Sequence, residues 1–183
     1  MRAAATALAF ALAMTCTAPV SAGAARVVRD ARDVPLVDQT GTTFTLRALH
    51  RPTAVVFIDT DCDDACAIAE GIFAQLAERL KNAHLDARLV TVTLDPDHEP
   101  PIVMAAAARK FNADAARWRW ASGQPRNVKD LMAAFNVVRI NKKFHSTFAY
   151  VLDARGLPAR EILLSTSAGA ELLSALRAAS KRA

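Results

Sequence analysis

The chain has 183 residues, of which 52% are hydrophobic, and a formal net charge of +5. This length suits one domain with a hydrophobic core and is too short to suggest two. The basic residues are spread along the chain and form no run, which favours a solvated basic surface over a nucleic-acid site.

The first 24 residues have the pattern of a secretory signal peptide. Arg2 gives a positive start, residues 3–25 carry no charge, and Ala22-Gly23-Ala24 fits a signal-peptidase site. We therefore predict a signal peptide over residues 1–24 and an exported domain over residues 25–183.

Two alternatives for the same segment stay open. The uncharged run is long enough to span a bilayer, so it could be an uncleaved anchor, although Pro19 and the many alanines would make that anchor a poor one. Cys16 could instead carry a lipid, but the residues before it match a lipoprotein signal weakly.

The rest of the chain alternates β-prone and helix-prone segments. We predict a hairpin over 35–46, strands over 54–59, 85–94, 118–120, 147–152 and 159–164, and helices over 63–80, 99–111, 124–135 and 168–179. Trp118 and Trp120 are expected to pack at a sheet edge. Alternating strands and helices indicate a mixed sheet covered on both faces. The order predicts an α/β, thioredoxin-like fold with an extra N-terminal β-hairpin and an inserted helix.

Cys62 and Cys66 lie where an apolar strand hands over to a helix, and His145 opens a later strand. Sulfur atoms one helical turn apart can face the same point in space. Two thiolates and an imidazole suit a soft metal, with copper as the leading candidate. The sequence thus proposes Cys62, Cys66 and His145 as metal ligands.

The same residues allow other chemistry. Loss of Cys16 with the signal would leave two cysteines, the paired number expected in an oxidising compartment, so Cys62 and Cys66 could form a structural disulfide. Such a bridge closes a very small loop and would stabilise the fold little. Zinc could also take two sulfurs, a nitrogen and a water, with Asp95 as a general base for hydrolysis.

Charges around the cysteines predict how reactive they are. The positive end of the following helix favours a thiolate, whereas Asp61, Asp63 and Asp64 disfavour a second anion. We expect thiols that stay protonated when the site is empty and ionise when metal binds. The remaining histidines, His50, His84 and His98, are expected to be solvated surface residues.

Four segments resemble the Sco/SenC family of thioredoxin-fold copper proteins, over roughly residues 34–180. They are the opening hairpin 36–46, the strand and CxxxC motif 55–66, the strand and acidic-proline turn 90–97, and the histidine strand 144–153. The resemblance implies that Cys62 and Cys66 are thiolate ligands, that His145 is the imidazole ligand, and that Asp95 lies near the copper (Cu+ or Cu2+) and assists metal handling without ligating it.

Members of this family help to load copper into the dinuclear centre of cytochrome c oxidase, and some reduce the cysteines of the apo-oxidase. The resemblance implies a periplasmic metallochaperone whose partner is the copper-centre subunit of apo-cytochrome c oxidase or another periplasmic copper protein. We expect no nucleic acid as a partner. We expect an association with the membrane only if the N-terminal segment is uncleaved.

The chain departs from the family pattern at three positions, because Asp63 and Ala67 replace the usual prolines and Phe144 replaces a common acidic residue. The alternative function is a metal-free thiol-disulfide oxidoreductase that uses Cys62 and Cys66. A peroxidase-like role is disfavoured by the acidic residues around Cys62.

Overall fold

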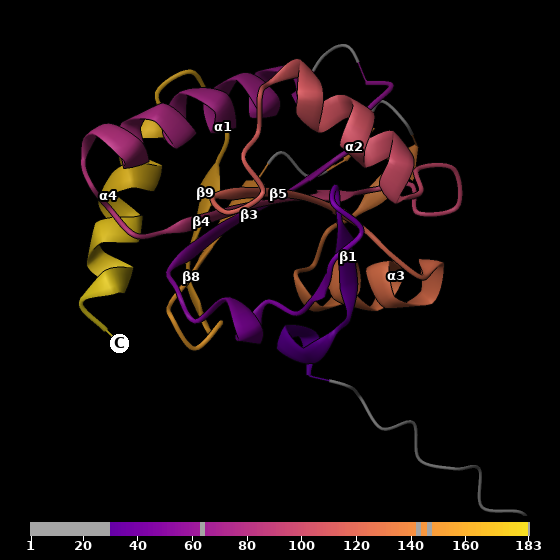
Figure 1. The fold of residues 1–183 in the computed structure, drawn as a ribbon, viewed down its shortest axis with the longest axis horizontal. Helices are drawn as coiled ribbons and strands as arrows, with labels where there is room; N and C mark the ends of the chain where they lie inside the picture. The colour runs from indigo at the N-terminus through magenta and orange to yellow at the C-terminus, as the bar shows by residue number, and fades with distance from the viewer. Residues whose placement is uncertain (1–29, 63–64, 142–143, 146–147, 183) are drawn as a thin grey trace, which may run out of the picture.

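A seven-stranded mixed sheet forms the centre of the computed structural model, which describes residues 30–62, 65–141, 144–145 and 148–182 (Figure 1). The predicted signal peptide, residues 1–24, lies outside the described residues. In spatial order the strands are β2 (Thr43–Phe44), β1 (Leu36–Asp38), β5 (Trp118–Ser122), β4 (Arg88–Thr93), β3 (Thr53–Ile58), β8 (Phe148–Leu152) and β9 (Pro158–Leu163). A second sheet pairs β6 (Arg139–Asn141) with β7 (Phe144–His145).

The three central strands β3, β4 and β5 run parallel, and the outer strands β1 and β8 run antiparallel to them. The connections between the parallel strands contain α1 (Ala65–Asn82) and α2 (Pro101–Lys110), while α3 (Pro125–Ala134) follows β5 and α4 (Ala168–Ser180) follows β9. Two short 3-10 helices, η1 (Ala31–Asp33) and η2 (Arg47–Leu49), complete the N-terminal part. The carboxyl ends of β3 and β4 therefore meet at one edge of the sheet.

Each central strand is buried on both faces, which explains its continuous apolar run. Successive side chains of β3 point to opposite faces, so Val56 packs in one core cluster and Val55 and Phe57 pack in another. Figure 1 shows α1 and α2 on one side of the sheet and α3 on the other, and α4 packs in the same core cluster as α1.

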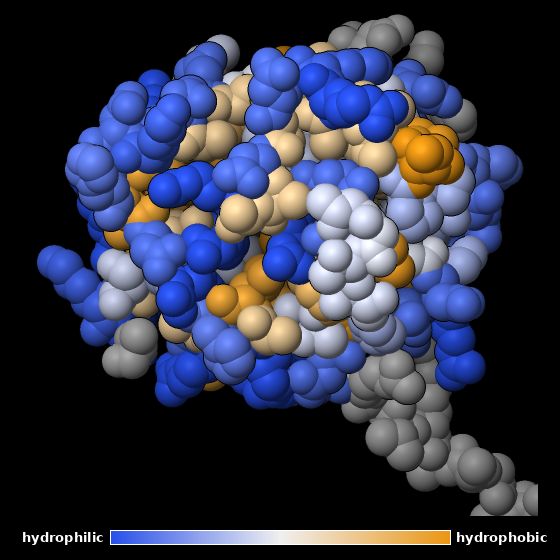
Figure 2. All heavy atoms as spheres, in the orientation of Figure 1, coloured by the Kyte–Doolittle hydropathy of each residue, from blue (hydrophilic) through white to orange (hydrophobic). Residues whose placement is uncertain are grey.

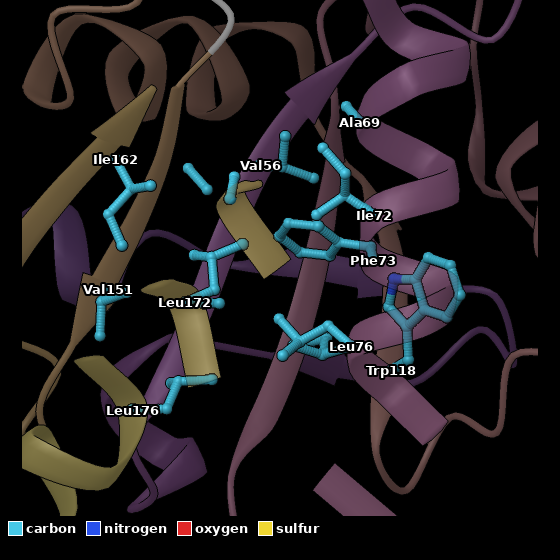
Figure 3. Packing of buried hydrophobic residues seen from close by; sticks show 14 of the residues in the cluster. Val56, Ala69, Ile72, Phe73, Leu76, Trp118, Val151, Ile162, Leu172 and Leu176 are labelled. Carbon is cyan, nitrogen blue, oxygen red and sulfur yellow. The ribbon is translucent and has the colours of Figure 1, made fainter. Parts of the chain in front are cut away.

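The first cluster joins α1, α2 and α4 to the sheet. Phe73 and Leu76 of α1 point towards Leu172 of α4 within this cluster (Figure 3), and all three side chains are fully buried. Both tryptophans of the chain, Trp118 and Trp120, belong to this cluster, with ring centroids 5.4 Å apart. This cluster holds α1, and with it the start of that helix, firmly on the sheet.

The second cluster lies between the sheet and α3. Phe135, which follows α3, places its ring centroid 5.7 Å from that of Phe57 and 4.9 Å from that of Tyr150. The hairpin of β1 and β2 extends this face with Leu36 and Phe44. The sheet is thus covered on both faces, as predicted.

Three details differ from the expectations. Trp118 and Trp120 do not lie at a sheet edge, because β5 is paired on one side with β1 and on the other with β4. Ile68 lies in the helix predicted over 63–80, where its apolar side chain is expected to face the core, yet it is 52% exposed. His145 does not open β8; it belongs to β7 in the small second sheet.

Polar residues cover most of the face shown in Figure 2, with small apolar patches between them. Within the described part of the chain, none of the helices is both long enough and apolar enough to cross a membrane.

Candidate functional site

The two cysteines come together where β3 ends and α1 begins. Residues 59–62, here called the cysteine loop, connect Ile58 to the segment that leads into α1. Cys62 is partly exposed, Cys66 in the first turns of α1 is fully buried, and the structure holds both as thiols. A hydrogen bond joins the two side chains. The predicted pairing of these sulfur atoms is therefore present in the fold.

Burial raises the pKa of the Cys66 thiol well above its ordinary value. The N–H of Asp59 donates to Cys66 Sγ at 3.3 Å and favours the thiolate, but the hydrogen bond with Cys62 and the nearby negative charges favour the protonated form. The Cys66 thiol is consequently protonated at neutral pH, as expected for the empty site. Burial is the largest cause, and among the residues that the structure describes the charge of Asp59 adds to it.

Asp59 shapes the cysteine loop and was not singled out by the sequence. Its carbonyl oxygen accepts from the Cys62 N–H at 3.2 Å, and its carboxylate accepts from the Asp61 N–H at 3.1 Å. The residue is buried. An acidic residue placed directly after a continuous apolar strand was the signal that could have identified it.

Glu99 is a second buried acid behind the cysteine loop, and the sequence placed it merely at the start of a helix. Its Oε1 accepts from the Thr60 N–H at 2.6 Å and from the Thr60 hydroxyl, and its Oε2 accepts from the Thr93 hydroxyl. Burial raises the pKa of Glu99, although the bonds from Thr60 and Thr93 lower it. Glu99 thus contacts both the cysteine loop and the end of β4.

Asp95 lies in the turn after β4 and is buried, while its neighbour His98 has an 81% exposed side chain. The ring nitrogen Nδ1 of His98 lies 2.9 Å from Asp95 Oδ1, so the carboxylate and the imidazole are paired. Among the residues that the structure describes, no three His, Cys, Asp or Glu side chains lie close enough together to hold a metal ion. Asp95 is therefore not brought into a ligand cluster with the two cysteines.

His145 is described only through its main chain, which pairs with Arg139 in the β6–β7 hairpin. We call residues 139–145 the histidine hairpin. The chain then enters β8 at Phe148, and β8 runs antiparallel to β3 with Ala149 opposite Val56. It enters the main sheet at the edge where β3 ends and the cysteine loop begins. The role of His145 as a ligand stays a prediction, as do the roles of the other site residues.

The fold and the thiol pair define the class of the protein. The two cysteines lie where a parallel strand ends and the next helix begins, and helices cover both faces of the sheet. This is the arrangement of a thioredoxin-like thiol protein. Residues 29–179 match the SCO1/SenC family, and the chain belongs to that family.

Relatives and solved structures agree with this assignment. A SCO2-like protein of Rickettsia felis is 25% identical over 146 residues, which cover 74% of this chain and 70% of that protein. A SCO1/SenC family lipoprotein from Bacillus anthracis superposes with a TM-score of 0.71 at 20% identity, covering 80% of this chain and 92% of that one. ScoI of Bradyrhizobium japonicum with copper bound has a TM-score of 0.66 at 20% identity, covering 79% of this chain and 96% of that one. The predicted family and thioredoxin-like fold are confirmed.

Proposed function

We propose that this chain is an exported copper-binding protein that delivers copper to the copper centre of cytochrome c oxidase. Cys62, Cys66 and His145 would hold the copper. The observation that carries the proposal is the contact between the two thiols at the end of β3. Paired sulfur donors suit copper(I), and the copper-bound structure of Bradyrhizobium japonicum ScoI supports the same cargo here.

The different burial of the two thiols fits a metal that is taken up and passed on. Cys62 is partly exposed and can meet a donor or an acceptor of copper, whereas Cys66 is buried and completes the site from inside. Binding requires that the Cys66 thiol lose its proton, and burial raises the pKa of that thiol. Copper affinity should therefore fall as the pH is lowered, because protons compete with the metal.

Histidine supplies the proposed third ligand. The histidine hairpin leads into β8 at the edge of the sheet where the cysteine loop begins. This placement supports a copper site shared between the loop and the hairpin. Asp95, paired with His98 in the turn after β4, would assist metal transfer from a neighbouring position.

Export would bring the protein to the periplasm, where its partner would be the copper-centre subunit of apo-cytochrome c oxidase or another periplasmic copper protein. The signal-like pattern of residues 1–24 supports export. The Bacillus anthracis relative, a SCO1/SenC family lipoprotein, supports a role outside the cytoplasm.

The deciding experiment is metal analysis of the reduced protein, prepared without oxygen and loaded with copper(I). We expect one equivalent of copper, which the double variant Cys62→Ser/Cys66→Ser loses. His145→Ala should weaken copper binding strongly. A matched control is His84→Asn, because His84 is exposed and its left-handed φ of 51° is one that asparagine tolerates. Copper binding by His145→Ala at the strength of the parent would contradict the proposed ligand set.

The second candidate is a metal-free thiol-disulfide oxidoreductase, favoured by the contact between a partly exposed and a buried thiol. In that reaction Cys62 and Cys66 would be oxidised to a disulfide while a partner disulfide is reduced to two thiols, a transfer of two electrons. Exchange with a disulfide peptide distinguishes the two functions, since His145→Ala should leave exchange largely intact. A parent protein that exchanges disulfides but binds no copper would favour this candidate.

A further inference from the structure

The carboxylate of Glu99, which lies in the segment between β4 and α2, joins two parts of the chain that come from different strands. One is the cysteine loop after β3, whose Thr60 donates to Glu99 Oε1 through its N–H at 2.6 Å and through its hydroxyl. The other is the end of β4, whose last residue, Thr93, donates its hydroxyl to Glu99 Oε2. Glu99 is itself buried, so these bonds are shielded from water.

The contacts around Glu99 suit its ionised form. Both oxygen atoms act as acceptors, for one main-chain N–H and for two hydroxyl groups. Hydrogen bonds to a charged acceptor are stronger than those between neutral groups. A glutamine at this position would keep the size of the side chain but would replace the charged acceptor with a neutral amide, so the hydrogen bonds to Thr60 and Thr93 would be weaker.

The bonds continue from Glu99 to both halves of the site. On one side, Thr60 directly follows Asp59, whose N–H donates to Cys66 Sγ at 3.3 Å and whose carbonyl accepts from the Cys62 N–H at 3.2 Å. On the other side, the Thr93 hydroxyl accepts from the Asp95 N–H at 2.9 Å. A connected series of hydrogen bonds thus runs from the buried sulfur atom to the Asp95 turn.

We propose that Glu99 is a positioning residue that holds the cysteine loop in the geometry that pairs Cys62 with Cys66, and that it couples this geometry to the Asp95 turn. Glu99 does not touch the sulfur atoms and acts through Thr60. The inference rests on the proposed function only for its effect on copper; its effect on the thiols stands by itself.

The test compares Glu99→Gln with the parent as reduced, metal-free proteins. The alkylation rate of each cysteine by iodoacetamide is measured by mass spectrometry, and the equilibrium of the thiol pair with glutathione is measured beside it. We expect Cys66 to react about tenfold faster in Glu99→Gln, and the copper(I) dissociation constant to rise about tenfold. The matched control, Glu78→Gln on the exposed surface of α1, should behave as the parent does.

An effect of Glu99→Gln on the thiols through a general loss of stability must be distinguished from an effect through the position of the cysteine loop. Ile72→Val in the core serves for this purpose, because it weakens the docking of α1 without touching Glu99. Alkylation rates are compared at urea concentrations that bring both variants to equal stability. A larger gain in Cys66 reactivity for Glu99→Gln supports positioning, and an equal gain for both variants overturns it.

Thr60→Val supplies a second route if Glu99→Gln does not fold. It removes one donor to Glu99 and keeps the carboxylate, so a smaller gain in Cys66 reactivity is expected, and parental rates would overturn the inference. A parent that binds no copper, together with a Glu99→Gln variant whose thiols are altered, would refute the proposed copper function and leave the positioning role standing.

Discussion

The cysteine loop and the histidine hairpin are two parts of one proposed site, and the fold supports them differently. Hydrogen bonds hold the cysteine loop, from the Asp59 N–H to Cys66 and from the Thr60 N–H to Glu99. Helix α1, which follows the loop, packs in the first core cluster. The histidine hairpin pairs β6 with β7 in a sheet of their own. A two-stranded hairpin has little stability by itself.

This difference indicates that buried contacts of the main sheet hold the thiol pair, whereas His145 is carried by a hairpin outside that sheet. Changes in the hairpin should therefore alter copper affinity with little effect on global stability, and changes beneath the loop should affect both.

The largest effect is expected for Phe73→Ala. Phe73 is fully buried in α1 and contacts the ring of Trp118, with centroids 6.3 Å apart, so its removal leaves a cavity beneath the helix that carries Cys66. We expect a loss of about 3–5 kcal/mol in the free energy of unfolding, measured by circular dichroism in urea. Ile68→Ala on the same helix is the control and should cost less than about 0.5 kcal/mol. Equal losses for the two variants would refute this account of how the loop is supported.

Glu70→Gln, in the same helix, should have a smaller and pH-dependent effect on the free energy of unfolding. Burial raises the pKa of Glu70 from 4.5 to about 7; the charge of Glu99 adds to the rise, and that of Lys110 opposes it. Below pH 4.5 the group is protonated in both the folded and the unfolded protein. Between pH 4.5 and about 7 it ionises in the unfolded chain first, so the parent loses stability as the pH rises, and above about 7 the loss is constant.

Glu70→Gln should accordingly be about 1 kcal/mol more stable than the parent at pH 8, since solvent screens the partly exposed charge. At pH 4 the two proteins should be equally stable. Urea unfolding at both pH values tests this, with Glu78→Gln as the exposed control. A difference that is the same at both pH values would mean that the charge of Glu70 is not its cause.

Lys129→Ala should change the stability by about 0.5 kcal/mol or less. The Lys129 ammonium lies 2.7 Å from the Asp97 carboxylate and links α3 to the turn that contains Asp95, but both side chains are exposed. Exposed ion pairs contribute little and are screened by salt. The small loss should disappear in 1 M sodium chloride, and a loss that persists there would indicate a packing role for the lysine stem.

The smallest effect on stability is expected for His145→Ala, because the histidine hairpin is not part of the central sheet. The free energy of unfolding should stay near that of the parent while copper affinity falls. Circular dichroism and copper titration of one preparation measure both quantities. A loss of several kcal/mol would show that the hairpin supports the core, and the comparison drawn above would be wrong.

Much of the central fold could be predicted from local patterns. The apolar run after Pro52 predicted a strand over 54–59, and the structure has β3 at Thr53–Ile58. Helical spacing predicted a helix over 63–80; α1 is described over Ala65–Asn82, and residues 63–64 lie outside the described part. The strand is a continuous apolar run and the helix repeats its apolar residues at helical spacing, and both patterns follow from burial.

The less predictable parts depend on contacts between distant segments. Thr60 and Glu99 are 39 residues apart, and their bond exists because parallel strands end at the same edge of a sheet, which no local pattern encodes. The histidine hairpin was missed because β6 and β7 are short and mostly polar, so they show no alternation of apolar residues. The thiol pair could be predicted because the two cysteines are only four residues apart, although Cys62 lies in the cysteine loop and only Cys66 belongs to α1.

Both tryptophans of the chain lie on one strand, β5, within the cluster that joins α2 and α1 to the sheet. With their rings 5.4 Å apart, Trp118 and Trp120 share one buried environment, which dominates the intrinsic fluorescence of the protein. Emission would shift to longer wavelength when this layer opens to water. A fluorescence-detected melt therefore follows the loss of the packed helical layer, and opening of the thiol pair alone needs a separate optical label.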